Sequence, residues 1–449
     1  MSVGQGWYMS RGKCSSVLVL SLTLAFLLVV PVFADSHVRA VRLSDAQGAV
    51  QIDRNTGQGF ENAFLNLPLT QGAKIRTQER GQAAVEFEDG STVRLAPNTT
   101  VELPQLLLRD SGVKFSTVNV EEGTAYVDFL GTKDNIVEVT FARESLTLTK
   151  AVHLRVEMVD VNATVAVFKG EASITGPQGT AEVNKNHTAD FDLLDDHYTV
   201  AAGIDELPYD SWDRQQAEFQ QQYSTRSYSK YSPDAYGSAD LNYYGSFFSV
   251  PGYGMLWQPY FIGAGWDPFM NGAWALYPGS GYGWVSGYPW GWTPYRCGAW
   301  TFLQTYGWAW QPTGSCMAWN TFPVVLNAPR NFVLPRPPLL PGRRIFPVNL
   351  GPAPVQSGNR LQIATNSAGL GIARGSIRNL GQLSQRVDQT GFVTTRVHTP
   401  SVGGGWWHSG TAPASHMGMS MGHGSSSGSS MSSGHSMGGG HASSVGGHH

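Results

Sequence analysis

The chain has 449 residues, of which only 14% are charged, and it contains 53 glycines and 25 prolines. A typical globular domain carries about 25% charged residues and roughly 12% glycine plus proline, so this composition excludes one uniform compact enzyme. The net charge of −3 conceals an asymmetry, because residues 251–449 hold ten Arg and two Asp, a net +8, while residues 1–250 carry −11. An acidic folded module is therefore predicted beside a basic segment. The basic segment would contact an anionic polymer, a membrane surface or the acidic module, or serve solubility alone.

The first 34 residues have the pattern of a secretion signal. Two basic residues precede an apolar run from Val17 to Val32, and a small-residue cleavage motif ends at Ala34. This pattern predicts a signal peptide over residues 1–34 and export to the periplasm, the cell surface or the extracellular medium. The run approaches the length of a membrane-spanning helix, so retention as an anchor is the alternative. No later stretch is long and apolar enough to span a bilayer.

Short segments in which polar and apolar residues alternate predict an all-β module over residues 38–200. Asp89-Gly90 stands between two such segments, Ala84–Glu88 and Thr92–Leu95, and this arrangement is a strong hairpin signal. Repeated glycines suit turns and bulges, and the lack of helical periodicity favours a β-sandwich or a β-solenoid. Four alternate residues around the hairpin are expected to share a buried face: Val85, Phe87, Val93 and Leu95.

Three stretches of this module resemble the FecR domain. The first runs from Leu67 to Thr99, and the later ones are Val120–Val127 and Val167–Ile174. The resemblance implies an extracytoplasmic β domain, which in the best-known members follows a membrane helix and a cytoplasmic anti-sigma segment and relays a transporter signal. Ten residues before the basic pair are too few for that segment, so only the β module is carried over to this chain.

Acidic residues of the β module are the candidate catalytic groups, namely Glu121, Glu122, Asp89 and the cluster from Asp190 to Asp196. Glycosidase-type chemistry needs two carboxylates that converge on a cleft, whereas carboxylates on strand edges and turns are usually solvated. A nucleophile-elbow pattern at Gly424–Gly428 falls in low-complexity sequence, and phosphate-loop and zinc-protease motifs are lacking. We therefore predict a protein that is not an enzyme and carries no cofactor.

A connector helix is predicted over residues 205–226. Asp210 can cap it, and Trp212, Phe219 and Tyr223 share one helical face. The helix is therefore expected to pack back onto the β module. Residues 227–250 are rich in Ser and Tyr with few aliphatic side chains, which predicts a linker.

Ten of the fourteen tryptophans lie between Trp257 and Trp319, which indicates a Trp-rich repeat domain over residues 251–320. Residues 265–274 align with 291–300, and a second motif recurs, so one small structural unit is used more than once. Either the rings form the core, or some stay exposed as platforms that stack on sugar rings or prolines. The candidate ligand or partner contacts are Trp257, Trp266, Trp274, Trp284, Trp292, Arg296, Trp300, Trp308 and Trp310.

The Trp-rich segment resembles two kinds of domain. It is loosely similar to the choline-binding repeats of cell-wall proteins. It is more closely similar to a Trp- and Pro-rich domain of unknown function found behind FecR domains in bacterial exported proteins, through Ser286–Tyr295. This second resemblance implies no activity. Because export leads to an oxidising setting, Cys297 and Cys316 are candidates for one disulfide, with free thiols as the alternative.

The C-terminal part divides into three segments. Residues 321–349 are rich in Pro and Arg and predict an extended, semi-rigid spacer, and residues 350–400 are expected to be weakly structured, with strands near Leu361 and Phe392. Residues 401–449 are mostly Gly, Ser, His and Met, which predicts a disordered tail that either solubilises the chain or binds copper weakly. The candidate metal ligands are His416, Met417, Met419, Met421, His423, His435 and His441.

Together these patterns predict an exported, non-catalytic protein of the bacterial cell envelope that holds envelope glycan or an envelope protein. Two alternatives remain open: a sensor or regulator related to FecR transmembrane signalling, and weak copper or metal handling through the tail. Nucleic acid is not an expected partner, because the Arg-Pro segments lack an accompanying nucleic-acid-binding fold signature. The pattern leaves the oligomeric state open.

Overall fold

In the computed structural model the described residues are 1–2, 4, 39–224, 237–277, 281–316, 324–339, 345–348, 355–357, 360–390 and 392–396. They belong to one compact unit, residues 1–409, and a second unit, residues 410–449, lies outside them. All but three residues of the predicted signal peptide, and all the candidate metal ligands of the tail, also lie outside the described residues. Every helix in the described ranges is too short or too polar to traverse a lipid bilayer.

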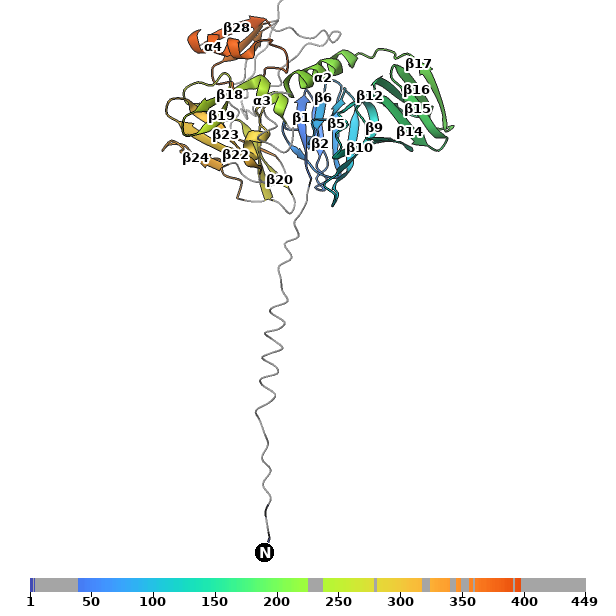
Figure 1. Ribbon diagram of the computed structural model, residues 1–449, viewed down its shortest axis with the longest axis horizontal. Helices are drawn as coiled ribbons and strands as arrows, with labels where there is room; N and C mark the ends of the chain where they lie inside the picture. The colour runs from blue at the N-terminus through green and yellow to red at the C-terminus, as the bar shows by residue number, and fades with distance from the viewer. Residues whose placement is uncertain are drawn as a thin grey trace, which may run out of the picture. The chain divides into compact units, whose positions relative to one another are not determined.

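A mostly antiparallel β module occupies residues 41–202 and confirms the all-β prediction (Figure 1). Its strands are β1 (Val41–Gln47), β2 (Val50–Asp53), β3 (Glu61–Asn62), β4 (Pro68–Leu69), β5 (Ala73–Thr77), β6 (Gln82–Glu86), β7 (Thr92–Leu95), β8 (Thr100–Leu108), β9 (Lys114–Phe129), β10 (Asn135–Phe141), β11 (Glu144–Leu148), β12 (Val152–Val159), β13 (Asn162–Lys169), β14 (Glu171–Gly176), β15 (Gly179–Asn184), β16 (His187–Asp192) and β17 (His197–Ala202).

These strands form two layers that share β9. Layer A has the order β4-β1-β6-β7-β9-β12-β13-β16-β17. Layer B has the order β3-β2-β5-β8-β9-β10-β11-β14-β15, in which β10 runs parallel to β9. The first part of β9 pairs in layer B and its last seven residues, from Gly123, pair in layer A. Gly123 has φ 83°, and a Cβ there would lie 2.2 Å from the Asn98 carbonyl oxygen, so this crossing requires glycine.

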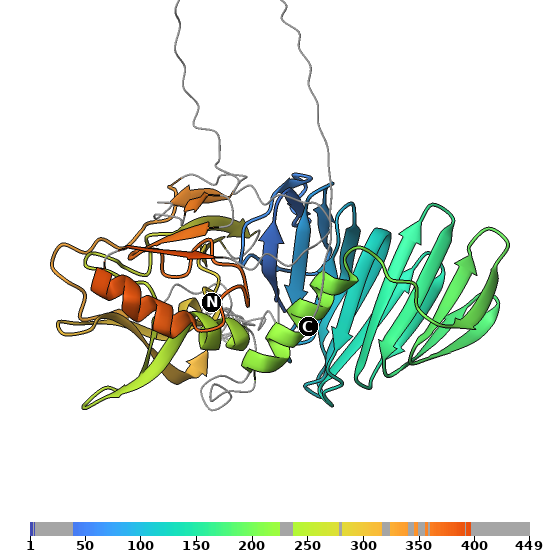
Figure 2. The same cartoon turned by 90° about the horizontal axis from the view of Figure 1, so that it is seen from above.

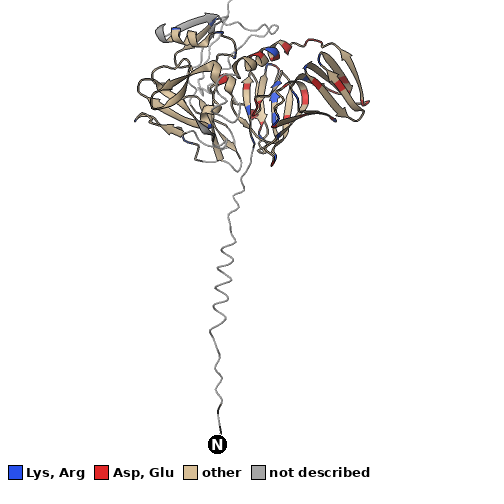
Figure 3. Cartoon of the chain, viewed as in Figure 1, with Lys and Arg blue, Asp and Glu red and all other residues tan. Residues whose placement is uncertain are grey.

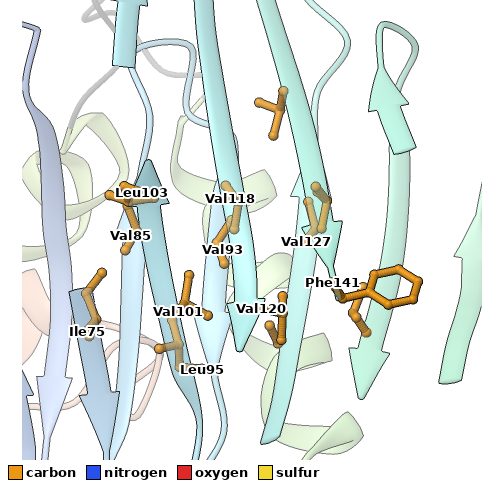
Figure 4. Close-up of a cluster of buried hydrophobic side chains, with 14 of the residues drawn as sticks. Ile75, Val85, Val93, Leu95, Val101, Leu103, Val118, Val120, Val127 and Phe141 are labelled. Carbon is orange, nitrogen blue, oxygen red and sulfur yellow. The ribbon is translucent and has the colours of Figure 1, made fainter. Parts of the chain in front are cut away.

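The hydrophobic core lies between the layers and consists mainly of aliphatic side chains (Figure 4). Alternation along each strand sends one set of side chains inward, as the period of a β-strand requires. The predicted hairpin is confirmed, because β6 pairs with β7 in a register that places Val85 opposite Val93, and Gly90 adopts φ 89°. The four side chains expected on its inner face are at most 1% exposed: Val85, Phe87, Val93 and Leu95.

Two helices follow the β module. Helix α2 (Asp210–Ser224) falls within the predicted connector and lies across strands of layer A (Figure 2). Helix α3 (Ser238–Tyr244) and strand β18 (Gly245–Val250) occupy the described part of the segment predicted to be a linker, so that prediction is wrong over 237–250. The physical reason is that Leu241, Tyr243 and Tyr244 are buried, and tyrosine rings supply the apolar area that aliphatic residues would otherwise provide.

The Trp-rich segment folds into two small sheets. One has the order β18-β19-β23-β22-β24 and the other the order β21-β20-β25. Its further elements are β19 (Gly254–Pro259), β20 (Gly272–Tyr277), β21 (Gly281–Ser286), η1 (Thr293–Tyr295), β22 (Cys297–Leu303), β23 (Gly307–Cys316), β24 (Val324–Leu326) and β25 (Phe346–Val348). Because β24 and β25 belong to these sheets, residues 324–326 and 346–348 are part of this fold and not of the separate spacer that the Pro and Arg content predicts.

The segment predicted to be weakly structured contributes to the same core. The expected strands near Leu361 and Phe392 are present as β27 (Arg360–Ala364) and β28 (Phe392–Arg396), and β27 pairs with β28 on one side and with β26 (Val355–Ser357) on the other. Helix α4 (Leu380–Thr390) was not expected. Five aliphatic side chains of this region are buried against the aromatic residues: Leu361, Ile363, Leu370, Leu380 and Val387.

Candidate functional site

The candidate contacts of the Trp-rich segment lie in its core. The eight candidate tryptophans are at most 4% exposed, and Arg296 is 7% exposed. The hypothesis that these rings form exposed stacking platforms is therefore wrong for this structure. The reason is the apolar surface area available for burial. Residues 251–320 contain few aliphatic side chains, so the indole rings are the largest apolar groups that can form a core.

Trp290, which the sequence analysis left out of the candidate set, lies at the centre of this aromatic core. Its ring stacks on Tyr288 with centroids 4.9 Å apart and planes 7° apart, and it lies 4.9 Å from the ring of Trp257. Its Nε1 donates a hydrogen bond of 2.8 Å to the carbonyl oxygen of Ala368. The C-terminal region thus accepts the hydrogen bond of a fully buried indole, a contact between residues 78 positions apart that the sequence pattern does not show.

Other ring N–H groups are also satisfied inside the core. Trp257 Nε1 donates to the Leu241 carbonyl at 3.0 Å, and Trp310 Nε1 donates to the Cys297 carbonyl at 2.7 Å. The Arg296 guanidinium lies 3.5 Å from the ring centroid of Trp292, and its Nη1 donates to the Trp292 carbonyl. Such a contact holds the cation inside the core rather than presenting it to an anionic ligand.

The two copies of the shorter sequence repeat occupy neighbouring strands, and those of the longer repeat lie in different sheets. The motif of residues 253–259 forms β19, its copy at 306–312 falls in β23, and the two strands pair with Trp257 opposite Trp310. In the longer repeat, Trp274 lies in β20 and Trp300 in β22. Each repeat therefore supplies one strand and its inward indole to a common core.

Cys297 is disulfide-bonded. Strands β22 and β23 pair in a register that places Cys297 opposite Cys316, the partner that the cysteine count suggests. A cross-strand bond at this position would fasten the two strands at the end where Gly298, at φ 68°, interrupts the regular pairing.

A buried layer of charge lies between α2 and the outer face of layer A. Asp213 accepts a hydrogen bond of 2.7 Å from Arg94, and its other oxygen lies 2.7 Å from His153 Nε2. Asp210 pairs with Arg155 at 2.6 Å and accepts a hydrogen bond of 2.8 Å from the Tyr126 hydroxyl. Because apolar and polar residues alternate along each strand, the outer face of layer A is polar. The contacts of Asp210 and Asp213 pair its buried charges, which explains why α2 can pack there.

The pKa values of these groups reflect burial and pairing. Burial acts to raise the pKa of Asp213, but Arg94 and His153 outweigh it and hold the pKa below its usual value. Burial, aided by the Asp210 carboxylate, raises the pKa of Tyr126 far above that of a free tyrosine. Asp213 is thus an anion and Tyr126 a neutral donor at neutral pH, which suits a structural role better than proton transfer.

A second set of charges joins the β module to α3 and the C-terminal region; we call it the interdomain seam and define it as Arg42, Glu86, Asp240 and Arg374. Arg42, fully buried, contacts Glu86 at 2.8 Å and Asp240 at 2.7 Å. Arg374 binds both oxygens of Asp240, at 2.8 and 2.7 Å. Gly237, at φ 65°, permits this approach, because a Cβ there would lie 2.9 Å from Arg42 Nη1. The seam therefore places four charges where each has an opposite partner.

Backbone carbonyls of the Trp-rich domain complete this junction. Arg42 donates to the Pro289 carbonyl at 2.8 Å, and Asn66 donates to the carbonyls of Ser286 and Tyr288. Arg374 in turn donates to the Ser44 carbonyl of β1 at 2.7 Å. The β module thus donates hydrogen bonds to carbonyls of the Trp-rich domain, and it accepts one from the C-terminal region.

Charged residues concentrate in the β module and α2, whereas the Trp-rich part is nearly uncharged (Figure 3). Strand β17 ends layer A, and β16 is its only strand partner in the described part of the chain. Five of its six residues are exposed, including Val200. One edge of β17 thus offers backbone donors and acceptors to another strand.

An apolar groove lies in the Trp-rich domain. It has a volume of about 640 Å³ and is bordered by β20, β21 and the extended run after β24; the lining residues are Trp274, Tyr282, Phe332, Val333, Leu334, Pro335, Arg336 and Pro337. Arg336 is the one charged group among these lining residues. The described ranges contain no cluster of three potential metal-binding side chains.

Comparison with known proteins identifies two domain families. A FecR family model ("FecR protein") matches residues 73–173, and the model of a family of unknown function, DUF6600, matches residues 238–335. A search of curated proteins found no match. Two crystal structures of one protein, described as a candidate anti-sigma factor from Parabacteroides distasonis ATCC 8503, align with 31% of this chain and 63% of that chain, at 16% identity and a TM-score of 0.27.

The boundaries of the family matches agree with the geometry. The FecR match lies inside the two-layer β module, and the DUF6600 match begins at the first residue of α3 and ends beside the apolar groove. The two resemblances seen in the sequence are thereby confirmed. The chain contains a FecR domain, formed within the two-layer module, followed by a DUF6600 domain built on an aromatic core.

Proposed function

We propose that this chain is an exported, non-catalytic protein of the cell envelope that binds a partner protein along the edge of β17. The FecR match supports a role related to FecR envelope signalling. The protein version of the binding hypothesis is favoured over the glycan version because the candidate tryptophans are buried. The leading observation is the exposed, half-paired strand β17.

The location of β17 favours a partner that adds a strand. Layer A is covered by α2 and by the seam over β1, β6 and β7, so its outer face is already occupied there. The opposite end of layer A, at β16 and β17, has exposed polar and small side chains. An extended peptide could pair with the free edge of β17 through backbone hydrogen bonds, and Val200 would give it one apolar contact.

A lysine variant of this edge tests the proposal. In Val200→Lys/Ala202→Lys, the two added charges disfavour strand pairing, so recovery of envelope proteins crosslinked to the chain in intact cells is expected to fall at least about fivefold. The matched control is Val159→Lys, which changes a 54% exposed valine in β12 beside the turn to β13. Equal recovery from wild type, edge variant and control would contradict binding at β17. Recovery of cell-wall fragments alone would contradict a protein partner.

A non-catalytic role is supported by the state of the carboxylates. Glu121 is paired with Lys74 at 2.6 Å, and Asp190 accepts a hydrogen bond from Thr164 on the neighbouring strand. Asp192 accepts backbone hydrogen bonds in its own turn. These carboxylates thus take part in ion pairs and turns, the structural role expected of carboxylates on strands and in turns.

A further inference from the structure

We infer that the chain contacts an anionic phospholipid bilayer through the run from Val324 to Leu339, at the C-terminal end of the DUF6600 domain. Four aliphatic side chains there are exposed: Val324 (49%), Leu326 (42%), Val333 (79%) and Leu339 (101%). We call them the apolar loop surface. Side chains of this size lose hydration favourably on entering an apolar phase, so their joint exposure indicates that something apolar covers them.

The charge around this surface selects the partner. Arg330 and Arg336 are both exposed, and the sequence has no Asp or Glu between Asp267 and Asp388. Exposed aliphatic residues interspersed with arginine and free of carboxylates match a surface that is apolar inside and negatively charged outside. An anionic bilayer has both properties.

The groove beside the loop is consistent with the same partner. Its walls are the rings of Trp274, Tyr282 and Phe332 together with the backbone run that carries Val333 and Arg336. A volume of about 640 Å³ is within the range of small-molecule sites in general, roughly 300–1,000 Å³. The acyl chain of a phospholipid could lie along these rings while the phosphate of the same lipid binds the guanidinium of Arg336. Arginine suits this role because its planar guanidinium forms charge-assisted hydrogen bonds with phosphate oxygens.

A second exposed apolar cluster provides the internal contrast. Val159, Val161 and Leu194 lie at the turns that end β12 and β16, and Leu194 is 72% exposed. Asp160 and Asp195 stand beside them in the sequence. An anionic membrane would repel this cluster, so although both places expose aliphatic side chains, lipid binding is expected only at the apolar loop surface.

Vesicle binding tests the inference. The exported chain would be purified from cells, its N-terminus determined, and its flotation measured with vesicles of equal parts phosphatidylglycerol and phosphatidylcholine or of phosphatidylcholine alone. We expect binding to the anionic vesicles, reduced about tenfold or more in Val333→Asp/Leu339→Asp and by about tenfold at low salt in Arg330→Gln/Arg336→Gln. The matched control, Val159→Asp/Leu194→Asp, is expected to bind like wild type.

A local measurement separates this surface from any other membrane contact of the chain. Hydrogen exchange on adding anionic vesicles is expected to slow for amides within 324–334 and to stay unchanged in the turn after β12. Soluble glycerol phosphate is expected not to displace the chain from anionic vesicles, because it carries the phosphate but offers no apolar phase to the aliphatic side chains. The inference is overturned if the wild type does not bind anionic vesicles, or if Val333→Asp/Leu339→Asp binds as well as the control Val159→Asp/Leu194→Asp. It is also overturned if the amides within 324–334 stay unprotected, or if glycerol phosphate displaces the chain from the vesicles.

Discussion

The FecR domain and the DUF6600 domain form their hydrophobic cores from different kinds of side chain. The first buries Val, Leu, Ile and Phe between two β layers, and strand alternation decides which residues are inside. The second buries Trp, Tyr and Phe in short strands, and three of its buried indoles donate their N–H groups to backbone carbonyls elsewhere in the chain. An aliphatic core thus depends on shape alone, whereas an aromatic core of this kind depends also on hydrogen-bond partners far away in the sequence.

The largest expected effect comes from removing the central ring. Trp290→Ala leaves a cavity and an unpaired Ala368 carbonyl, so we expect the free energy of unfolding to fall by about 5 kcal/mol, measured by urea denaturation with circular dichroism. Leu95→Ala in the FecR core removes packing alone and is expected to cost about 3 kcal/mol. If the two substitutions cost the same, the distinction between the cores is wrong.

Next in size is the effect of breaking the interdomain seam. Asp240→Asn deprives Arg42 and Arg374 of a shared carboxylate, and we expect a loss of about 4 kcal/mol, because two buried cations lose a counter-charge. Calorimetry should then resolve two transitions, since the domains would no longer unfold together. Glu102→Gln, which alters a half-exposed partner of Lys74, is the control and is expected to change stability by less than about 1 kcal/mol. A single unchanged transition in Asp240→Asn would show that the seam does not couple the domains.

The smallest effect concerns pH and the helix that covers layer A. Asp213 has a pKa lowered in the folded state, so its stabilising contribution is present above the unfolded value of 3.8 and is lost as pH falls through the folded pKa. Asp213→Asn is therefore expected to cost about 2 kcal/mol at pH 7 and progressively less below pH 4. Stability measured from pH 7 to pH 3 checks this; a cost that stays constant with pH would contradict an ionised Asp213.

Local patterns in the sequence predicted the FecR domain well. The Asp89-Gly90 hairpin and its inward residues follow from alternation over a dozen positions, which any two-layer β fold must respect. The connector helix followed from the same kind of reasoning, with Trp212 buried on its inner face. Its polar partners could not be foreseen, because Asp210 and Asp213 meet Arg155 and Arg94 only when the sheet brings together strands distant in the sequence.

The DUF6600 domain was predicted less completely for a physical reason. Tyrosine-rich sequence after α2 resembles a linker by composition, yet Tyr243 and Tyr244 are core residues, with burial raising the pKa of Tyr243 to about 12. Aromatic rings are amphipathic, so composition alone does not tell a platform from a core. The seam was also out of reach, since Arg42 and Asp240 are separated by almost two hundred positions and neither lies in a recognisable motif.

Strand β9 has a consequence for how the chain is made. Because it supplies pairing to both layers, β8 in layer B and β7 in layer A both keep an open edge until the residues of β9 have been synthesised. Domains generally fold as units during synthesis, so the nascent FecR domain would expose open edges for longer than a module assembled hairpin by hairpin. Gly123 marks the crossover: the residues of β9 before it complete the pairing of β8 in layer B, and those after it complete the pairing of β7 in layer A.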